Sequence, residues 1–278
     1  MIRTVKSIVH SLRRKCTPVP PPIVAQVSTL HENQFLKNRR ILITGGGKGL
    51  GFAIAERCVS CGAEVLICGR DIETLQTSAQ KLNCAWRRLD MMDVSSFSGF
   101  IDNLFTDGGF HADTLVCNAG ISLHEADFID VTPESFDKQI ATNLRGAFFL
   151  AQAFVKKLLS LKDKGNILFI SSETGETPDL RPYGWTKAAT NSMAQGLAYR
   201  LSRDRIRVNA IAPGVTATGM TGFGLDDLTY NASPTGRAYI PEEIAEIAAF
   251  LISDLAAPIS GQIITCNNAR TINARWRE

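Results

Sequence analysis

The stretch RRILITGGGKGLGFAIAERC, residues 39–58, contains a short apolar run, a glycine-rich turn and the start of a helix. Glycines at Gly45, Gly49 and Gly51 allow the backbone to turn sharply and to approach a bound group closely. The N–H groups at the start of the following helix attract negative charge. A strand, a glycine turn and a helix in this order are typical of a loop that holds a pyrophosphate. The stretch therefore predicts the opening unit of a nucleotide-binding fold.

Six more apolar runs of strand length follow, and segments of helical length such as 71–82 and 133–161 lie between them. Continuous apolar strands that alternate with helices are typical of a parallel sheet covered on both faces. The sequence predicts an α/β fold, Rossmann-like and doubly wound, with seven parallel strands in a single domain. Ligands should bind beyond the carboxyl ends of the strands. The strand candidates are residues 39–44, 64–68, 86–89, 113–117, 166–170, 207–212 and 262–265.

The composition excludes several classes of protein. Of 278 residues, 45% are hydrophobic and 21% are charged, which is enough for a substantial core. A net charge of +3, without a basic stripe that contains aromatic residues, argues against nucleic-acid binding. No apolar run approaches the roughly 18 residues that a membrane-spanning helix needs.

The two ends of the chain differ from the middle. We expect a basic, proline-containing N-terminal extension (1–37), a catalytic domain (38–268) and a C-terminal tail (269–278). Residues 1–31 carry five basic residues and no acidic residue. This segment fits a mitochondrial transit peptide, an amphipathic helix that contacts a membrane or a partner, or a solvated extension. We favour the extension, and we therefore expect a cytoplasmic protein, with a mitochondrial location as the alternative.

The cysteines and histidines do not predict a metal site. The seven cysteines are scattered along mostly apolar segments, as is typical of buried thiols in a reducing compartment. Cys58 and Cys61 have CxxC spacing, but no second pair accompanies them, and the four histidines show no ligand spacing. We expect no bound metal.

The end of the second predicted strand bears on the choice of cofactor. In nucleotide-binding folds of this kind, a carboxylate after this strand binds the ribose 2′-hydroxyl of NAD, and an arginine accommodates the 2′-phosphate of NADP. Here Gly69 and Arg70 occupy the place, and Lys48 in the glycine loop is a second cation. Asp71 is interpreted as the N-cap of the next helix. The sequence thus favours NADP(H) over NAD(H).

Eight motifs in a fixed order resemble those of the short-chain dehydrogenase/reductase family, and the resemblance covers roughly residues 38–268. The closing segment 241–265 also resembles the last helix and strand of that family. The motifs are Thr44-Gly45-x-x-x-Gly49-x-Gly51, Asp90, Asn118-Ala119-Gly120, Asn143, Ser172, Tyr183-x-x-x-Lys187, Asn209 and Pro213-Gly214-x-x-x-Thr218.

The resemblance implies an oxidoreductase that interconverts a carbonyl and a secondary alcohol on a small molecule, and that forms a homodimer or homotetramer. It implies the catalytic set Asn143, Ser172, Tyr183 and Lys187. The cofactor would be held by Thr44, Gly45, Gly47, Lys48, Gly49, Leu50, Gly51, Arg70, Asp90, Met91, Asn118, Ala119, Gly120, Tyr183, Lys187, Pro213, Gly214, Val215 and Thr218.

These catalytic residues suit the chemistry. Tyr183 and Lys187 are four residues apart and share one face of a helix. An ammonium near the phenol would lower the pKa of tyrosine toward the working range. Ser172 would donate to the substrate oxygen as charge develops, and Asn143 would hold a water that relays protons. Ser172 is preferred to Ser171 because Gly175 follows it by three residues.

Three segments depart from the family pattern. The loop from Ser172 to Tyr183 is about two residues shorter than is usual for the family, and it contains Arg181, which could clamp an anionic substrate or pair with nearby acids; we favour pairing. The predicted lid, residues 219–237, is short and polar, which favours a compact polar substrate such as a sugar derivative or small keto-alcohol. Residues 266–270, CNNAR, replace an acidic residue and glycine. The alternatives are a 3-oxoacyl-carrier-protein reductase-like enzyme and a non-catalytic NADP(H)-binding regulatory protein.

Overall fold

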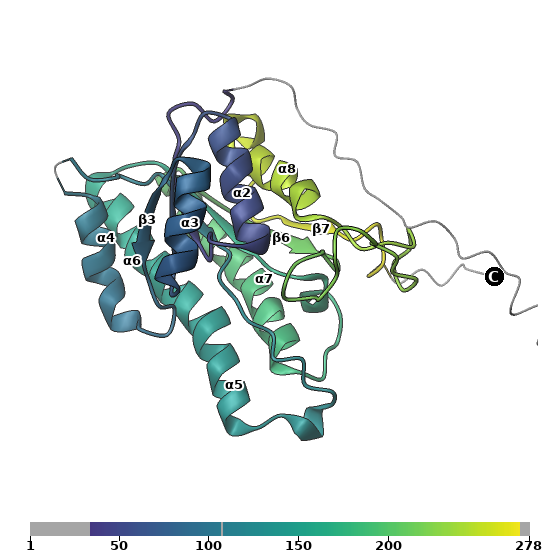
Figure 1. Ribbon diagram of the computed structural model, residues 1–278. Helices are drawn as coiled ribbons and strands as arrows, with labels where there is room; N and C mark the ends of the chain where they lie inside the picture. Colours follow the sequence, from purple (N-terminus) through teal and green to yellow (C-terminus); the bar gives the residue numbers. More distant parts are fainter. Residues whose placement is uncertain (1–33, 107, 273–278) are drawn as a thin grey trace, which may run out of the picture.

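A single parallel sheet of seven strands forms the centre of the molecule (Figure 1). The computed structural model describes residues 34–106 and 108–272. The strand order is β3-β2-β1-β4-β5-β6-β7, so the chain builds outward from β1 to β3 and then crosses to β4. This order confirms the predicted fold. The strands are β1 (Arg40–Thr44), β2 (Glu64–Gly69), β3 (Ala85–Arg88), β4 (Thr114–Cys117), β5 (Gly165–Ile170), β6 (Ile206–Pro213) and β7 (Ile263–Cys266).

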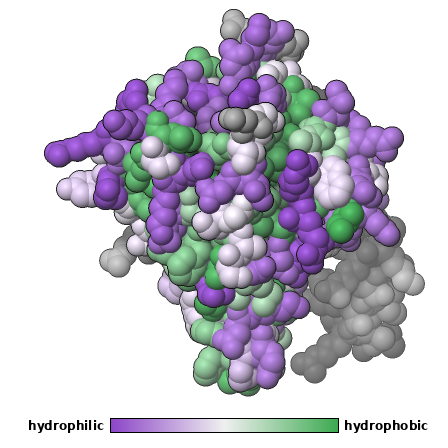
Figure 2. Space-filling model, turned by 90° about the vertical axis from the view of Figure 1, so that its left-hand side faces the viewer, coloured by the Kyte–Doolittle hydropathy of each residue, from purple (hydrophilic) through white to green (hydrophobic). Residues whose placement is uncertain are grey.

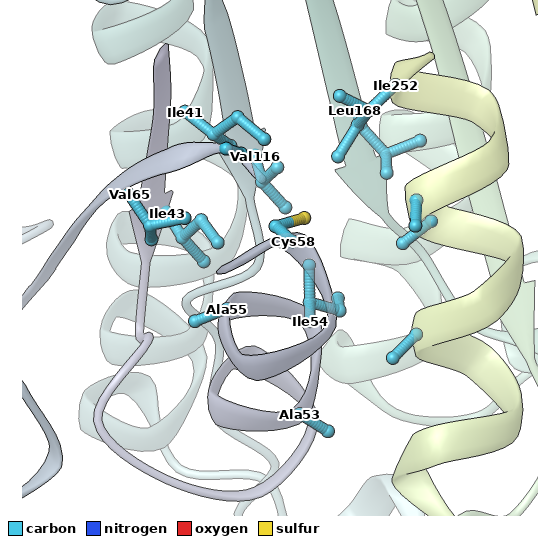
Figure 3. Packing of buried hydrophobic residues seen from close by; sticks show 14 of the residues in the cluster. Ile41, Ile43, Ala53, Ile54, Ala55, Cys58, Val65, Val116, Leu168 and Ile252 are labelled. Carbon is cyan, nitrogen blue, oxygen red and sulfur yellow. The ribbon is translucent and has the colours of Figure 1, made fainter. Parts of the chain in front are cut away.

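Helices cover both faces of the sheet because successive side chains of a strand point to opposite faces. Ile41 and Ile43 of β1 pack with α2 (Gly49–Ser60), α3 (Ile72–Leu82) and α8 (Pro241–Ile252), and Figure 3 shows part of this cluster. Leu42 packs on the other face with α4 (Phe97–Leu104), α6 (Gly146–Leu161) and α7 (Pro182–Leu201). The short 3-10 helices are η1 (Val94–Ser96), η2 (Phe128–Asp130), η4 (Glu173–Gly175), η5 (Ser202–Asp204) and η6 (Asp254–Ala256).

The segment 133–161, predicted as one helical stretch, contains a change of helix type. It begins as α5 (Pro133–Gln139), widens into a π-helical turn, η3 (Ile140–Arg145), and continues as α6. Thr132 caps the start through its hydroxyl, which accepts a hydrogen bond from the backbone N–H of Ser135. Asn143 lies in the π turn, and such turns are frequent at functional sites.

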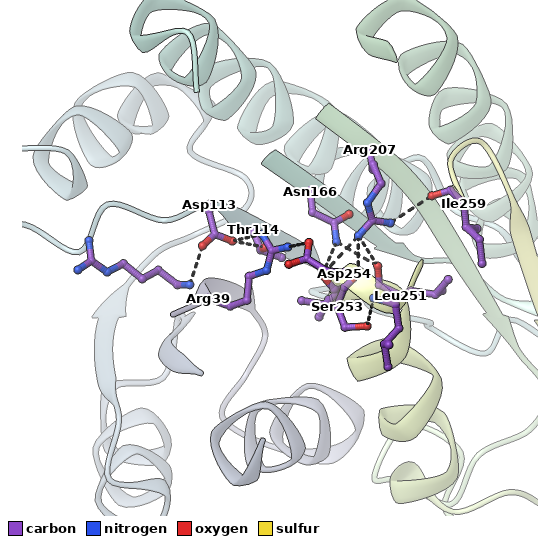
Figure 4. Close-up of polar contacts among 12 residues, drawn as sticks. Arg39, Asp113, Thr114, Asn166, Arg207, Leu251, Ser253, Asp254 and Ile259 are labelled. Carbon is purple, nitrogen blue, oxygen red and sulfur yellow. Dashed lines mark hydrogen bonds and ion pairs between the residues drawn. The ribbon is translucent and has the colours of Figure 1, made fainter. Parts of the chain in front are cut away.

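The amino ends of the central strands are joined to the end of α8 by a polar network (Figure 4). The Arg207 guanidinium donates to the carbonyls of Leu251, Ile252, Ser253 and Ile259 over distances of 2.8–3.4 Å. Asn166 donates to the first two of these carbonyls as well. The last carbonyls of a helix have no partner within the helix, so these side chains satisfy them.

We expect Arg207→Met to lower the free energy of unfolding by about 2 kcal/mol, because four carbonyls lose a charged donor. Urea denaturation measures the change. The matched control is Arg205→Met, since the Arg205 side chain is exposed and, among the described residues, donates to a single carbonyl, that of Lys162. Equal stability of the two variants would contradict the assigned capping role.

The described part of the chain starts just before the predicted boundary at residue 38. Leu36 is fully buried, and its N–H donates to the carbonyl of Cys61, so this residue belongs to the packed domain. The expectations for residues 1–31 lie outside the described residues. Among the helices that are described, none has the length and apolar character to cross a membrane.

Candidate active site

A cleft of about 1040 Å³ lies at the carboxyl ends of the strands, where the strand order reverses between β1 and β4. Its walls include Ser172 and all the predicted cofactor residues, but not Asn143. Those cofactor residues are Thr44, Gly45, Gly47, Lys48, Gly49, Leu50, Gly51, Arg70, Asp90, Met91, Asn118, Ala119, Gly120, Tyr183, Lys187, Pro213, Gly214, Val215 and Thr218.

The glycine loop is held in a conformation that other residues would not adopt. Gly49 has a φ of +55° at the start of α2. At Gly51, an added Cβ would lie 2.2 Å from the carbonyl oxygen of Gly45. The side-chain amide of Asn118 donates to the carbonyls of Thr44 and Gly45, at 2.9 and 3.1 Å. Asn118 therefore braces the loop in addition to lining the cleft.

The loop leaves room and backbone donors for a phosphate at the start of α2, which fits a dinucleotide. Two cations flank this place, Lys48 in the loop and Arg70 after β2, and both side chains are exposed. Neither side chain makes a hydrogen bond or ion pair with a residue that the structure describes. Asp71 caps α3, as predicted, by accepting from the N–H of Thr74 at 2.9 Å. This bond lowers the pKa of Asp71 and holds its carboxylate in place.

Tyr183 and Lys187 share one face of α7 and reach the same wall of the cleft as Ser172. Pro182 starts the helix, where its missing N–H costs nothing. A Cβ on Gly175 would lie 2.7 Å from the backbone of Lys187, so a glycine lets the serine loop pack directly on α7. Ser171 donates to the carbonyl of Lys187, a structural contact that supports the choice of Ser172 as the functional serine.

The electrostatics of this pair differ from the prediction. Burial raises the pKa of the Tyr183 phenol, a hydrogen bond with Ser172 opposes that rise, and the nearby Asp179 adds to it. The Lys187 ammonium donates to the carbonyl of Ile170 at 2.7 Å and lies 5.5 Å from the centre of the tyrosine ring. Burial lowers the pKa of Lys187 to about 8. The predicted lowering of the tyrosine pKa by lysine is therefore not what this arrangement shows, because burial is the largest influence on the phenol and raises its pKa.

Asn143 is buried in the π turn and braces the wall of the site. Its Oδ1 accepts from the N–H of Ile121, and its Nδ2 donates to the carbonyl of the same residue, both at 2.8 Å. Nδ2 also donates to the hydroxyl of Thr186 on α7, at 3.3 Å. Both polar atoms of the side chain thus have protein partners. The predicted water at Asn143 stays a prediction.

Two residues of the site, Thr174 and His124, were not pointed out by the sequence, and a third, Arg181, was. Thr174 donates to the Oγ of Ser172 through both its hydroxyl, at 3.0 Å, and its N–H, at 3.2 Å. The predicted pairing of Arg181 is confirmed, since its Nε lies 3.1 Å from the carboxylate of Asp179. His124 bonds the carbonyl of Met220 at 2.8 Å and so joins the lid to the opposite wall. Of the two missed contacts, the sequence could have indicated only that of Thr174, because a threonine two residues after Ser172 lies close enough to bond it.

The comparisons with known proteins agree with this geometry. A family model described as enoyl-(acyl carrier protein) reductase matches residues 45–268. The chain belongs to the short-chain dehydrogenase/reductase family. It is accordingly an oxidoreductase that acts on CH–OH groups with a cofactor bound in an NAD(P)-binding Rossmann fold, as predicted.

Relatives of this dehydrogenase/reductase have diverse names. This chain is 34% identical over 256 residues to a tropinone reductase homologue of Arabidopsis thaliana, and the match covers 86% of this chain and 95% of the relative. It is 32% identical over 247 residues to a 3alpha-hydroxysteroid dehydrogenase of Mediterraneibacter gnavus, covering 84% and 97%. The crystal structure of a putative gluconate dehydrogenase from Agrobacterium tumefaciens superposes with a TM-score of 0.80 at 26% identity, covering 87% of this chain and all of that one.

Within the described residues, no group of three or more histidine, cysteine, aspartate or glutamate side chains is arranged to hold a metal ion. The CxxC cysteines are both fully buried, and burial raises the pKa of each thiol. Thiols held in the protonated form are poor metal ligands and poor nucleophiles.

Proposed function

We propose that this enzyme uses NADP(H) to interconvert a carbonyl group and a secondary alcohol on a compact polar substrate. The observation that carries the proposal is the convergence of Ser172, Tyr183 and Lys187 on one wall of the cleft, beside the glycine loop. A bound nicotinamide supplies or accepts the hydride in this chemistry.

Each of the three side chains has a defined part in handling the proton. The Oγ of Ser172 accepts two hydrogen bonds from Thr174, so its own O–H is the donor in the hydrogen bond with Tyr183 and would turn to the substrate oxygen once a substrate is bound. The raised pKa of Tyr183 keeps the phenol protonated at neutral pH, as an acid for carbonyl reduction requires. The Lys187 ammonium, charged below about pH 8, would stabilise the phenolate as it forms.

The preference for NADP(H) rests on the charges beside the phosphate loop. Lys48 and Arg70 are exposed cations at the edge of the cleft, whereas the carboxylate of Asp71 is engaged as a helix cap. A 2′-phosphate would gain two positive neighbours, and a ribose hydroxyl would have no free carboxylate to bind.

We expect Lys48→Ala and Arg70→Ala each to lower kcat/KM for NADPH about ten-fold, because each removes a charged donor from the phosphate. The same variants should leave the NADH reaction nearly unchanged. The matched control is Lys81→Ala, since Lys81 is an exposed cation on α3 outside the cleft. Parallel losses with both cofactors would show that the two residues do not select the phosphate.

The substrate half of the cleft supports a polar ligand. Ser122, His124, Thr174 and Arg181 line it together with Ser172, Tyr183 and Lys187, and the apolar side chains of Leu123 and Met220 complete the wall. The lid uses part of its apolar residues internally, because Leu228 is buried with Phe223 and Tyr230 packed against it, whereas Leu225 is exposed and Met220 lines the cleft. The structural relative named as a gluconate dehydrogenase also favours a polar substrate. The relative named as a 3alpha-hydroxysteroid dehydrogenase favours an apolar one.

The experiment is a panel of carbonyl compounds assayed by NADPH consumption, with NADH in parallel. The panel contains keto-sugars and their acids, small keto-alcohols, a 3-oxosteroid and a 3-oxoacyl thioester. Turnover confined to the first two groups would support the proposal. Preference for the thioester would establish a 3-oxoacyl reductase instead, and tight NADPH binding without any turnover would favour a regulatory binding protein.

We also propose a homodimer or homotetramer in solution. Large aromatic residues are exposed on neighbouring helices: Phe136 on α5, Phe148 and Phe149 on α6, and Trp185 on α7. Figure 2 shows further hydrophobic residues at the lower end of the molecule, where Figure 1 places α5 and the loop before it. Light scattering after size exclusion should give at least twice the 30.3 kDa of the chain. A monomer at micromolar concentration would contradict this.

A further inference from the structure

The residue after the catalytic serine is a buried carboxylate. Glu173 lines the cleft, and its side chain is only 8% exposed. A carboxylate out of contact with water is unfavourable unless it is paired and hydrogen-bonded. Two residues that follow β7 meet this need. Arg270 forms an ion pair with Oε1, at 2.5 Å, and Asn267 donates to Oε2 at 3.1 Å.

The same arginine also binds the lid. Its Nη2 donates to the hydroxyl of Tyr230 at 3.1 Å, and its guanidinium lies over the ring of that tyrosine, 5.3 Å from the centre. Tyr230 in turn packs edge-on against Phe223, with ring centres 5.5 Å apart. One guanidinium thus joins the serine loop to the packed part of the lid.

The backbone that carries Arg270 is shaped for this contact. Asn268 and Ala269 both have positive φ, 49° and 65°, which for alanine is an uncommon conformation. Asn267 is buried, and its amide also donates to the hydroxyl of Thr271. Strained residues persist where their surroundings determine the conformation strongly. This turn directs Arg270 back toward the site, which explains the departure of residues 266–270 from the family pattern.

We propose that Arg270 is a positioning residue that links the lid to the catalytic serine through Tyr230 and Glu173. Its charge neutralises Glu173, so that no uncompensated anion lies next to the place where charge develops on the substrate oxygen. Its contact with Tyr230 holds the lid to the same guanidinium that neutralises Glu173. The inference rests on the proposed role of Ser172, and the lid contact can be tested without a substrate.

The first test is kinetic. Arg270→Met should lower kcat about 100-fold, because the Glu173 carboxylate is left buried and unpaired beside the reaction. NADPH affinity should change less than about two-fold, since Arg270 does not line the cleft. Adding Glu173→Gln to Arg270→Met should restore kcat about ten-fold by removing the unpaired charge. A rescue of kcat that exceeds any recovery in the free energy of unfolding separates this role from a purely structural one.

The second test needs no turnover. Hydrogen exchange of residues 219–237 should speed up in Arg270→Met, which removes both contacts with Tyr230, and less in Tyr230→Phe, which removes the hydrogen bond alone. Arg237→Met is the comparison, since Arg237 anchors the lid to Glu243 of α8 but does not touch Glu173. Arg237→Met should speed up hydrogen exchange of the lid, but adding Glu173→Gln to Arg237→Met should not raise kcat. Arg200→Met, which breaks an exposed ion pair with Asp204, should change neither readout.

The outcomes separate the ideas. Unchanged lid exchange in Tyr230→Phe and Arg270→Met would overturn the link, whether or not a substrate has been found. Failure of Glu173→Gln to rescue kcat would overturn the charge argument. If Arg270→Met does not fold, Tyr230→Phe and Arg270→Lys still test the link. Arg270→Lys should keep kcat within about five-fold of the wild type, because it retains the charge, and should speed up hydrogen exchange of the lid. If the wild type turns over no carbonyl compound, the proposed function fails while the exchange experiment still decides the link.

Discussion

Tyr183→Phe should lower kcat/KM for carbonyl reduction about 1,000-fold, because it removes the hydroxyl that donates the proton to the substrate oxygen. NADPH affinity should stay within about two-fold of the wild type. The fold should tolerate the change, since phenylalanine keeps the ring beside Lys187, whose ammonium lies 5.5 Å from the ring centre. Steady-state kinetics and NADPH fluorescence titration measure the two quantities.

The matched control for this substitution is Tyr199→Phe. Tyr199 also lies on α7, but its side chain is 88% exposed and does not line the cleft. It should retain full activity. If Tyr183→Phe kept more than about a tenth of the wild-type rate, another group would have to be the acid, and the assignment of the site would be wrong.

Much of the fold could be predicted from local sequence patterns. Strands buried on both faces are written as continuous apolar runs, which located the central strands, whereas the edge strand β3 (AWRR) is mostly exposed and contains two arginines. The cap role of Asp71 followed from its position before a helix, and the structure confirms it. The choice of Ser172 over Ser171 depended on the spacing to Gly175, and the observed contact of Gly175 with α7 gives that spacing its physical reason.

The remaining features depend on contacts between distant residues. Glu173 and Arg270 are 97 residues apart, and nothing in the sequence shows that one carboxylate and one guanidinium share a buried site. Spacing placed Tyr183 and Lys187 on one helix face, but it could not show that the ammonium bonds Ile170 on β5 or that the phenol is poorly solvated. Solvation is a property of the assembled site, and so the direction of a pKa shift was not available from spacing.

The π turn shows the same limit on a smaller scale. The apolar pattern of residues 133–161 is helical throughout, and it gives no sign of a wider turn at Ile140–Arg145. The turn accompanies the contacts of Asn143 with Ile121 and Thr186, two residues on other segments. A sequence pattern reports the average period of a segment and not the local contact that changes it.

Lys187→Met should abolish most activity and yet make the protein more stable. Burial lowers the pKa of this lysine from 10.5 to about 8, so the folded protein holds the ammonium at a cost that the unfolded chain does not have. At pH 7 that cost is about 3 kcal/mol. Methionine has a similar length and no charge, but it loses the hydrogen bond to Ile170, worth about 1 kcal/mol. We therefore expect a net gain of about 2 kcal/mol in the free energy of unfolding at pH 7.

The pH dependence tests the cause of that gain. The unfolded chain keeps the lysine proton up to its ordinary pKa, whereas the folded protein releases it near pH 8, so wild-type stability should rise relative to the variant as pH increases. The advantage of Lys187→Met should shrink to about 1 kcal/mol at pH 9. Urea denaturation at both pH values measures it, and an advantage independent of pH would show that packing, not the buried charge, is responsible. Carbonyl reduction by the wild type should fall over the same range, since the ammonium that stabilises the phenolate is lost above about pH 8. A single lysine would then set the alkaline limit of activity and oppose the stability of the fold that holds it.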